Sequence, residues 1–182
     1  VGGTGAVTVD VINSSWRQTD NTGNTTVNVL YDYLGNLPGR GVTMVTAAGN
    51  GGFGEGSIGA PASSWNVITV GATSGTHGGD ETVTDFSAGG PVGSFGTPTT
   101  RTKPDLVAQG YHVEVPIYDP SNPDRFVPTS GTSFSAPVVA AGAALLIDMG
   151  KETGRSTDPR VVKAVLMNSA RTVSYTHLTL PT

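Results

Sequence analysis

The succession of strand, helix and strand patterns near the start of the chain constrains its fold most. Apolar and polar residues alternate over residues 7–11 and Ile12 follows, as in a strand that ends near residues 14–16. Apolar side chains at positions 27, 30, 31 and 34 have the spacing of one helical face, and a short apolar strand follows at residues 42–45. Strand, helix and strand within about forty residues form a βαβ unit, which predicts a parallel sheet.

The rest of the 182 residues continues this pattern. Further strands are expected at residues 67–70, 106–108 and 112–118, and an apolar, Ala-rich helix from Ser133 to about Met149. A last helix is expected over residues 159–169, with Asp158 as its N-cap and positions 161, 162, 165 and 166 facing inward. We therefore expect an α/β domain, a doubly wound and mostly parallel sheet with helices on both faces, which is incomplete.

Composition excludes several classes of function. Charged residues make up 13% of the chain, the net charge is −4 and no cluster of Lys and Arg occurs, which disfavours a nucleic-acid partner. No apolar run approaches the roughly 20 residues of a membrane span, so none is expected. The absence of cysteine excludes disulfides and thiolate metal sites.

Two short segments carry residues suited to catalysis. Gly131 and Thr132 deliver Ser133 to the first turn of the apolar helix, where free N–H groups can stabilise an oxyanion. The same residues also suit an ordinary N-cap on a core helix. Asn50 follows a parallel strand at the sheet edge where α/β proteins bind ligands, and its amide can donate to an oxyanion. An ordinary Asn-Gly turn is the alternative there.

Together these segments resemble the subtilisin-like serine peptidases, the subtilases. Residues 131–142 (GTSFSAPVVAAG) resemble the family's nucleophile motif, residues 48–50 its oxyanion segment, and residues 11–16 (VINSSW) its substrate-pairing strand. Further landmarks follow in family order at residues 59–62, 67–71, 85–87 and 103–108. The resemblance covers roughly residues 7–172 and corresponds to the C-terminal two-thirds of the catalytic domain.

The resemblance implies a role for each site residue. Ser133 would be the nucleophile of a serine endopeptidase, and Asn50 with the Ser133 backbone N–H would form the oxyanion hole. A peptide or protein substrate would pair with the strand at Ser14, Ser15 and Trp16, beside Thr132. Ala47, Ala48 and Gly49 would line the pocket for the side chain that precedes the scissile bond. Arg17 departs from the pattern, because glycine is common at its position.

The catalytic Asp and His of the family precede the oxyanion Asn, whereas His77, His112 and His177 all follow it. Asp10 lies too close to the substrate strand to be the family's Asp. We therefore expect that an N-terminal segment of the same domain is missing and that the chain alone is inactive. A non-catalytic peptide-binding relative and a sedolisin, whose oxyanion residue is typically Asp, are the alternatives.

Three further expectations concern cofactors, location and the C-terminus. No cofactor is needed for the chemistry and no metal ligand is assigned, although a structural Ca²⁺ is possible near residues 80–81, 85, 119 and 124. An extracellular location is a family-level expectation. Residues 173–182 (VSYTHLTLPT) match a translated transposase sequencing adapter, so the peptidase domain is expected to span residues 1–172 and the tail to be foreign.

Overall fold

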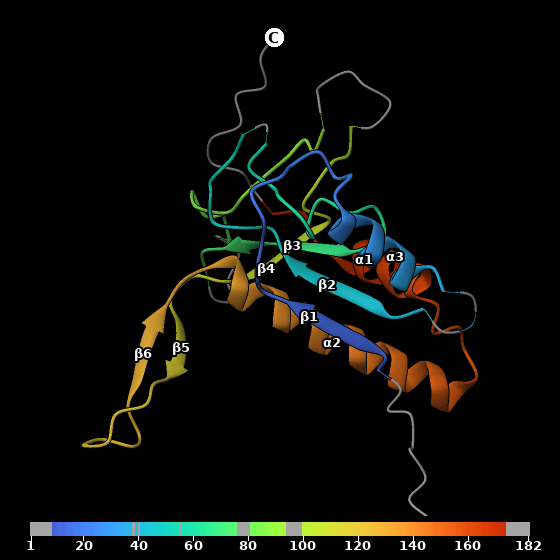
Figure 1. Cartoon of the computed structure of the whole chain (residues 1–182). Helices are drawn as coiled ribbons and strands as arrows, with labels where there is room; N and C mark the ends of the chain where they lie inside the picture. The colour runs from blue at the N-terminus through green and yellow to red at the C-terminus, as the bar shows by residue number, and fades with distance from the viewer. Residues whose placement is uncertain are drawn as a thin grey trace, which may run out of the picture.

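The computed structural model describes residues 9–37, 39, 41–54, 56–75, 81–93 and 100–173. Strands β1 to β4 form one parallel sheet in the order β1-β2-β3-β4, and β5 and β6 form a separate antiparallel hairpin (Figure 1). The elements, in chain order, are β1 (Val11–Ser14), α1 (Thr26–Gly35), β2 (Thr43–Ala47), β3 (Ile68–Thr73), β4 (Leu106–Gln109), β5 (Val113–Pro116), β6 (Phe126–Thr129), α2 (Thr132–Thr153) and α3 (Pro159–Ser169).

Helices cover both faces of the parallel sheet, which confirms the predicted α/β class. On one face, Val45 and Ile68 of the sheet pack against Val139 of α2, and Leu166 of α3 adjoins the same cluster. On the other face, Met44 packs against Tyr31 of α1. Alternate residues of β2 therefore point into two separate cores, as expected for a strand that is buried on both sides.

The βαβ unit is confirmed as β1-α1-β2. The prediction that Leu30 belongs to the inward face of its helix is wrong. Thr25 caps α1 in a reciprocal arrangement with Asn28, and β1 pairs in parallel with β2. Leu30 is 50% exposed, whereas Asn28 is fully buried. The Asn28 amide donates to the hydroxyls of Ser63 and Ser64, so the segment before β3 supplies polar partners where an apolar contact was expected.

Helix α2 extends from the site end of the sheet across one face. Its first turn is tied to the end of β4 by a 2.7 Å hydrogen bond from Gly131 N–H to the Gly110 carbonyl. Helix α2 is long and apolar enough to cross a membrane by length and composition alone. From the sequence, we expected no such helix among the residues that the structure describes. In the structure it lies against the strands of the sheet, and Ala136, Val139 and Ala143 are buried there.

Helix α3 has the predicted bounds but a narrower buried face. Asp158 accepts a 2.9 Å hydrogen bond from Arg160 N–H and Pro159 is the first helical residue, so both cap assignments are confirmed. Val162 is buried against α2 and Leu166 is half-buried. The inward assignment of positions 161 and 165 is wrong, because these valines are 41% and 42% exposed.

The hairpin of β5 and β6 projects away from the rest of the molecule (Figure 1). Only its first strand was expected, and that strand is shorter than the predicted range of residues 112–118. The second strand contains Pro128 and is half exposed, so it lacks a strong strand pattern. It forms by pairing with β5, in which Val115 lies opposite Val127.

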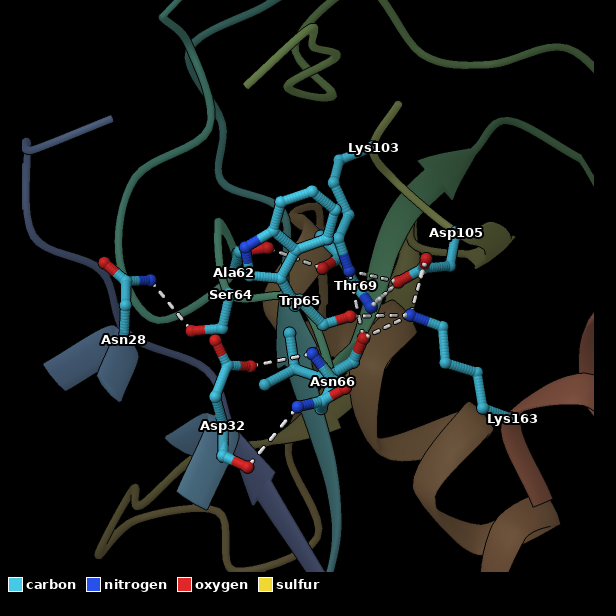
Figure 2. Close-up of polar contacts among 11 residues, drawn as sticks. Asn28, Asp32, Ala62, Ser64, Trp65, Asn66, Thr69, Lys103, Asp105 and Lys163 are labelled. Atoms are coloured by element: carbon cyan, nitrogen blue, oxygen red, sulfur yellow. Dashed lines mark hydrogen bonds and ion pairs between the residues drawn. The ribbon is translucent and has the colours of Figure 1, made fainter. Parts of the chain in front are cut away.

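A buried ion cluster fixes β3, the start of β4 and α3 relative to one another (Figure 2). The Asp105 carboxylate contacts the Lys103 ammonium at 2.6 Å and the Lys163 ammonium at 2.8 Å. It also accepts a 2.7 Å hydrogen bond from Thr69 N–H, and both lysines donate to the Val67 carbonyl. The family landmark at residues 103–105 is therefore the centre of a network that joins three elements. None of these residues lines the candidate pocket at the carboxyl edge of the sheet.

Candidate active site

Three segments meet at the carboxyl edge of the parallel sheet and form an open pocket of about 360 Å³. They follow β1, follow β2 and begin α2, so the topology brings together residues more than a hundred positions apart. This is the edge at which open α/β sheets bind ligands. The residues that line the pocket are Ser15, Trp16, Arg17, Ala47, Gly49, Asn50, Gly51, Thr132 and Ser133.

Ser133 occupies the first turn of α2 and faces the segment after β1. Its carbonyl accepts a 3.0 Å hydrogen bond from the Ser15 hydroxyl, and its own hydroxyl lies 3.5 Å from the Ser15 carbonyl. Its backbone N–H makes no hydrogen bond within the described part of the chain. The hydroxyl of such a residue can attack a carbonyl carbon, and its free helix-terminal N–H can donate a hydrogen bond to the resulting oxyanion.

Asn50 is held in one orientation by Thr132. Its side-chain oxygen accepts hydrogen bonds from the backbone N–H and the hydroxyl of Thr132, both at 3.0 Å. Because the Thr132 N–H can only donate, the oxygen of Asn50 must face it and the NH₂ group must face elsewhere. That NH₂ group makes no hydrogen bond to any residue that the structure describes, so it is available to a ligand.

Two glycines allow these segments to approach closely. Gly49 has φ of +109°, and its N–H donates to the Thr132 hydroxyl at 3.0 Å. A Cβ at Gly131 would lie 3.2 Å from the Asn50 side-chain nitrogen. Side chains at these two positions would therefore strain the loop or displace Asn50.

The structure brings together most of the predicted site residues. Two of them are turned away from the pocket. The Ser14 hydroxyl is buried and lies 2.8 Å from the hydroxyl of Tyr31. Ala48 is fully buried in a cluster with Ile58, Ala62 and others. These two residues could contribute backbone groups, but their side chains do not line the pocket.

Arg17 and Gly51 also line the pocket, and neither was predicted to do so. The sequence did mark Arg17 as a departure from the family's usual glycine, which is the one signal that could have pointed to it. The Arg17 guanidinium donates to the Ser57 carbonyl at 2.6 Å. That contact spans forty positions in the chain and cannot be read from local spacing.

No histidine or carboxylate of the described residues forms a hydrogen bond with the Ser133 hydroxyl. The ring of His112 stacks on Tyr111, and its backbone N–H donates to Ser130. His77 and His177 lie outside the described residues. Within the described residues, the structure therefore places no base beside the Ser133 hydroxyl.

The carboxylates considered for Ca²⁺ do not gather into a group of three or more within the described ranges. No group of three His, Asp or Glu side chains there could hold a metal ion. Glu81 pairs with Arg171 and Asp119 pairs with Arg125. Asp80 lies outside the described residues.

Comparison with known proteins agrees with this geometry. A family model described as the Subtilase family matches residues 6–180. Serine protease AprX of Bacillus subtilis (strain 168) is 30% identical over 142 residues, which cover 70% of this chain and 30% of AprX. The minor extracellular protease Vpr of the same strain is 33% identical over 95 residues, which cover 51% of this chain and 11% of Vpr. The chain thus matches less than a third of the length of either relative.

Solved structures share the fold over most of the chain. The self-cleaved protease domain of PatA superimposes with a TM-score of 0.66 at 27% identity, covering 89% of this chain and 54% of that one. Sphericase gives a TM-score of 0.65 at 25% identity, covering 88% of this chain and 48% of that one. Both alignments leave about half of the other chain unmatched.

Proposed function

The chain belongs to the subtilase family, and from this premise we propose that it supplies the nucleophile, the oxyanion hole and the substrate strand of a serine endopeptidase. One observation carries the proposal. The Ser133 hydroxyl, the Ser133 N–H and the unpartnered amide of Asn50 meet at one pocket. These groups supply the nucleophile and the oxyanion donors of acyl transfer from a peptide bond.

In the proposed reaction, the substrate backbone lies along residues 15–17 and pairs with them main chain to main chain. The Ser133 Oγ attacks the peptide carbonyl carbon and its proton passes to a base. The carbonyl oxygen becomes an oxyanion that accepts hydrogen bonds from the Asn50 amide and the Ser133 N–H. The C–N bond then breaks as the base returns the proton to the leaving amine, and water hydrolyses the acyl-enzyme.

We propose that the base and its orienting carboxylate come from a segment outside the 182 residues. Serine is a weak nucleophile unless an adjacent base removes its proton. In the resemblance described above, the Asp and His precede the oxyanion Asn. The relatives are also much longer than the matched region, which leaves room for such a segment in the natural protein.

Location and cofactor use are part of the same proposal. An extracellular site of action is supported by the similarity of the chain to the minor extracellular protease Vpr. The chemistry needs no cofactor, because attack, oxyanion binding and hydrolysis use protein groups and water. We propose that any Ca²⁺ bound by the natural protein serves its structure.

The test uses the full-length protein encoded by the natural gene. Wild type should hydrolyse peptides and react with a fluorophosphonate probe at Ser133, and Ser133→Ala should lose both while unfolding at the same temperature. Ser169→Ala is the matched control, because that exposed serine ends α3 and should not matter. Residues 1–172 alone should show no serine-dependent turnover.

Three outcomes would contradict the proposal. Labelling at another serine, or undiminished hydrolysis by Ser133→Ala, would remove Ser133 from the chemistry. Peptide binding without hydrolysis by the full-length protein would indicate a peptide-binding relative. Activity confined to strongly acidic pH would favour the sedolisin alternative.

A further inference from the structure

The pocket beside Ser133 contains the cationic side chain of Arg17. Arg17 follows the substrate strand, and its side chain crosses the floor of the pocket at Gly49 and Gly51. A Cβ built on Gly49 would lie 3.1 Å from Arg17 Cδ, and one built on Gly51 would lie 3.6 Å from Arg17 Nη1. The guanidinium therefore occupies space that two glycines leave open.

The guanidinium is anchored but not neutralised within the described residues. Its one hydrogen bond there joins Nη1 to the Ser57 carbonyl at 2.6 Å, and no acid in that part of the chain forms an ion pair with it. Three other arginines each pair with an acid, namely Arg125 with Asp119, Arg160 with Asp158 and Arg171 with Glu81. Arg17 thus keeps most of its five N–H donors for a ligand.

The other described residues that line the pocket are neutral, so among them Arg17 alone carries a charge. A guanidinium presents a planar fork of donors that matches a carboxylate, and such charge-assisted hydrogen bonds are stronger than neutral ones. The same charge repels Lys and Arg side chains. A pocket of about 360 Å³ has room for a Glu side chain beside the nucleophile.

We propose that Arg17 makes the enzyme select an acidic residue, Asp or Glu, immediately before the bond that it cuts. This inference rests on the proposed function and names its substrate class: polypeptides cleaved after acidic side chains. Arg17 is a specificity-determining residue in this scheme and takes no part in proton transfer.

The test compares peptides that differ only in the residue before the scissile bond, namely Glu, its neutral isostere Gln, or Lys. In the full-length protein, kcat/KM for Glu should exceed that for Gln by about 10- to 100-fold. Arg17→Gln should bring this ratio close to one, Arg17→Lys should keep part of it, and Arg17→Glu should favour Lys. Arg125→Gln, which alters an arginine of the projecting hairpin, should leave the ratio unchanged.

A Glu-to-Gln ratio near one in wild type, or a ratio that Arg17→Gln does not change, would overturn the inference. Thermal unfolding of each variant checks that the ratio is read on folded protein. The preference should also weaken at high salt, since it depends on an exposed charge.

A binding measurement separates this inference from the proposed function. Fluorescent peptides whose C-terminal residue is either Glu or Gln, and which are otherwise identical, are titrated onto the Ser133→Ala protein. A Glu preference that Arg17→Gln abolishes would support the charge selectivity of the pocket even if wild type hydrolysed nothing. Equal affinity for both peptides, or binding of neither, would overturn it.

Discussion

The side-chain oxygen of Asn50 accepts two hydrogen bonds from Thr132, one from its backbone N–H and one from its hydroxyl, each at 3.0 Å. The Thr132 hydroxyl in turn accepts from Gly49 N–H, so the loop after β2 and the first turn of α2 form one bonded unit. This unit aims the Asn50 amide into the pocket before any substrate binds. Preorganised donors of this kind stabilise charge that develops in the transition state.

Asn50→Ala in the full-length protein should lower kcat by roughly 10²–10³ and change KM little. The size of this loss is borrowed from subtilisin, another member of the family. The reason is that the side-chain NH₂ of Asn50 donates a hydrogen bond to the negative charge on the carbonyl oxygen, which is present mainly in the transition state. Steady-state kinetics measure the effect, with Asn24→Ala in an exposed loop as the control. A defect confined to KM would instead make Asn50 a binding or turn residue.

Thr132→Val should lower kcat by about 5- to 10-fold, since it removes the hydrogen bond that the hydroxyl donates to Asn50 and the one that it accepts from Gly49 N–H, while the Thr132 backbone N–H still holds Asn50. Thr132→Ser keeps the hydroxyl and should restore most of the rate. The exposed Thr153→Val is the matched control for the substitution itself. If Thr132→Ser is as slow as Thr132→Val, packing of the methyl group and not the hydroxyl is what matters.

Asp105→Asn should destabilise the protein by about 3–5 kcal/mol, because it leaves two ammonium groups facing each other without their carboxylate. Lys103→Met should cost less, since Lys163 still neutralises Asp105. Urea unfolding of the full-length variants measures both. Asp10→Asn breaks an exposed pair with Lys151 and should cost less than about 1 kcal/mol. Equal costs for Asp105→Asn and Asp10→Asn would contradict this account of the cluster.

The stability of the protein should depend on Lys103 between pH 8 and pH 10.5. Burial, which outweighs the attraction of Asp105, lowers the pKa of Lys103 from 10.5 to about 8. Between these values the unfolded chain binds more protons than the folded one, so the contribution of Lys103 to the free energy of unfolding rises with pH. Below pH 8 both states are protonated and the cost of burying the cation is present in full.

Unfolding measured from pH 7.5 to 10 on wild type and Lys103→Met isolates this effect, because other titrating groups cancel in the difference. Wild type should gain on the order of 2 kcal/mol relative to Lys103→Met across the range. A difference that stays flat with pH would show that Lys103 does not titrate there.

Resequencing of the source DNA should give a different continuation after codon 172, because residues 173–182 match translated adapter sequence. The family match extends to residue 180, so the question needs the DNA itself. Deleting these ten residues should leave the unfolding temperature of the rest unchanged. The same ten codons in independent genomic clones would make the tail native.

Local chemistry explains which elements the sequence could predict. The start of α3 follows from Asp158 and Pro159, because an N-cap and a first-turn proline act within a few residues. The second strand of the hairpin could not be predicted, since Pro128 weakens its local pattern and its partner strand supplies the hydrogen bonds. Helical spacing identified Val162 as inward but could not tell how wide a face its neighbours would cover.

The candidate site also contains residues that the sequence could predict and residues that it could not. Ser133 and Asn50 could be predicted, because a nucleophile at a helix start and an amide after a strand leave marks in short motifs. Arg17 could not be placed in the pocket, because its position depends on the Ser57 carbonyl and on two glycines of another loop. Outside the site, the buried amide of Asn28 was missed for a similar reason, because its partners Ser63 and Ser64 lie more than thirty positions away.

The floor of the pocket, at Ala47, Gly49 and Gly51, consists largely of main chain, whereas the groups proposed for the chemistry are fixed by Thr132 and Ser15. Arg17 forms no hydrogen bond with either of those anchors. In the proposed scheme, a single codon change at position 17 would therefore alter the substrate preference and leave the groups proposed for the chemistry in place. Under that proposal, we expect natural variants of this protein to diverge first at position 17.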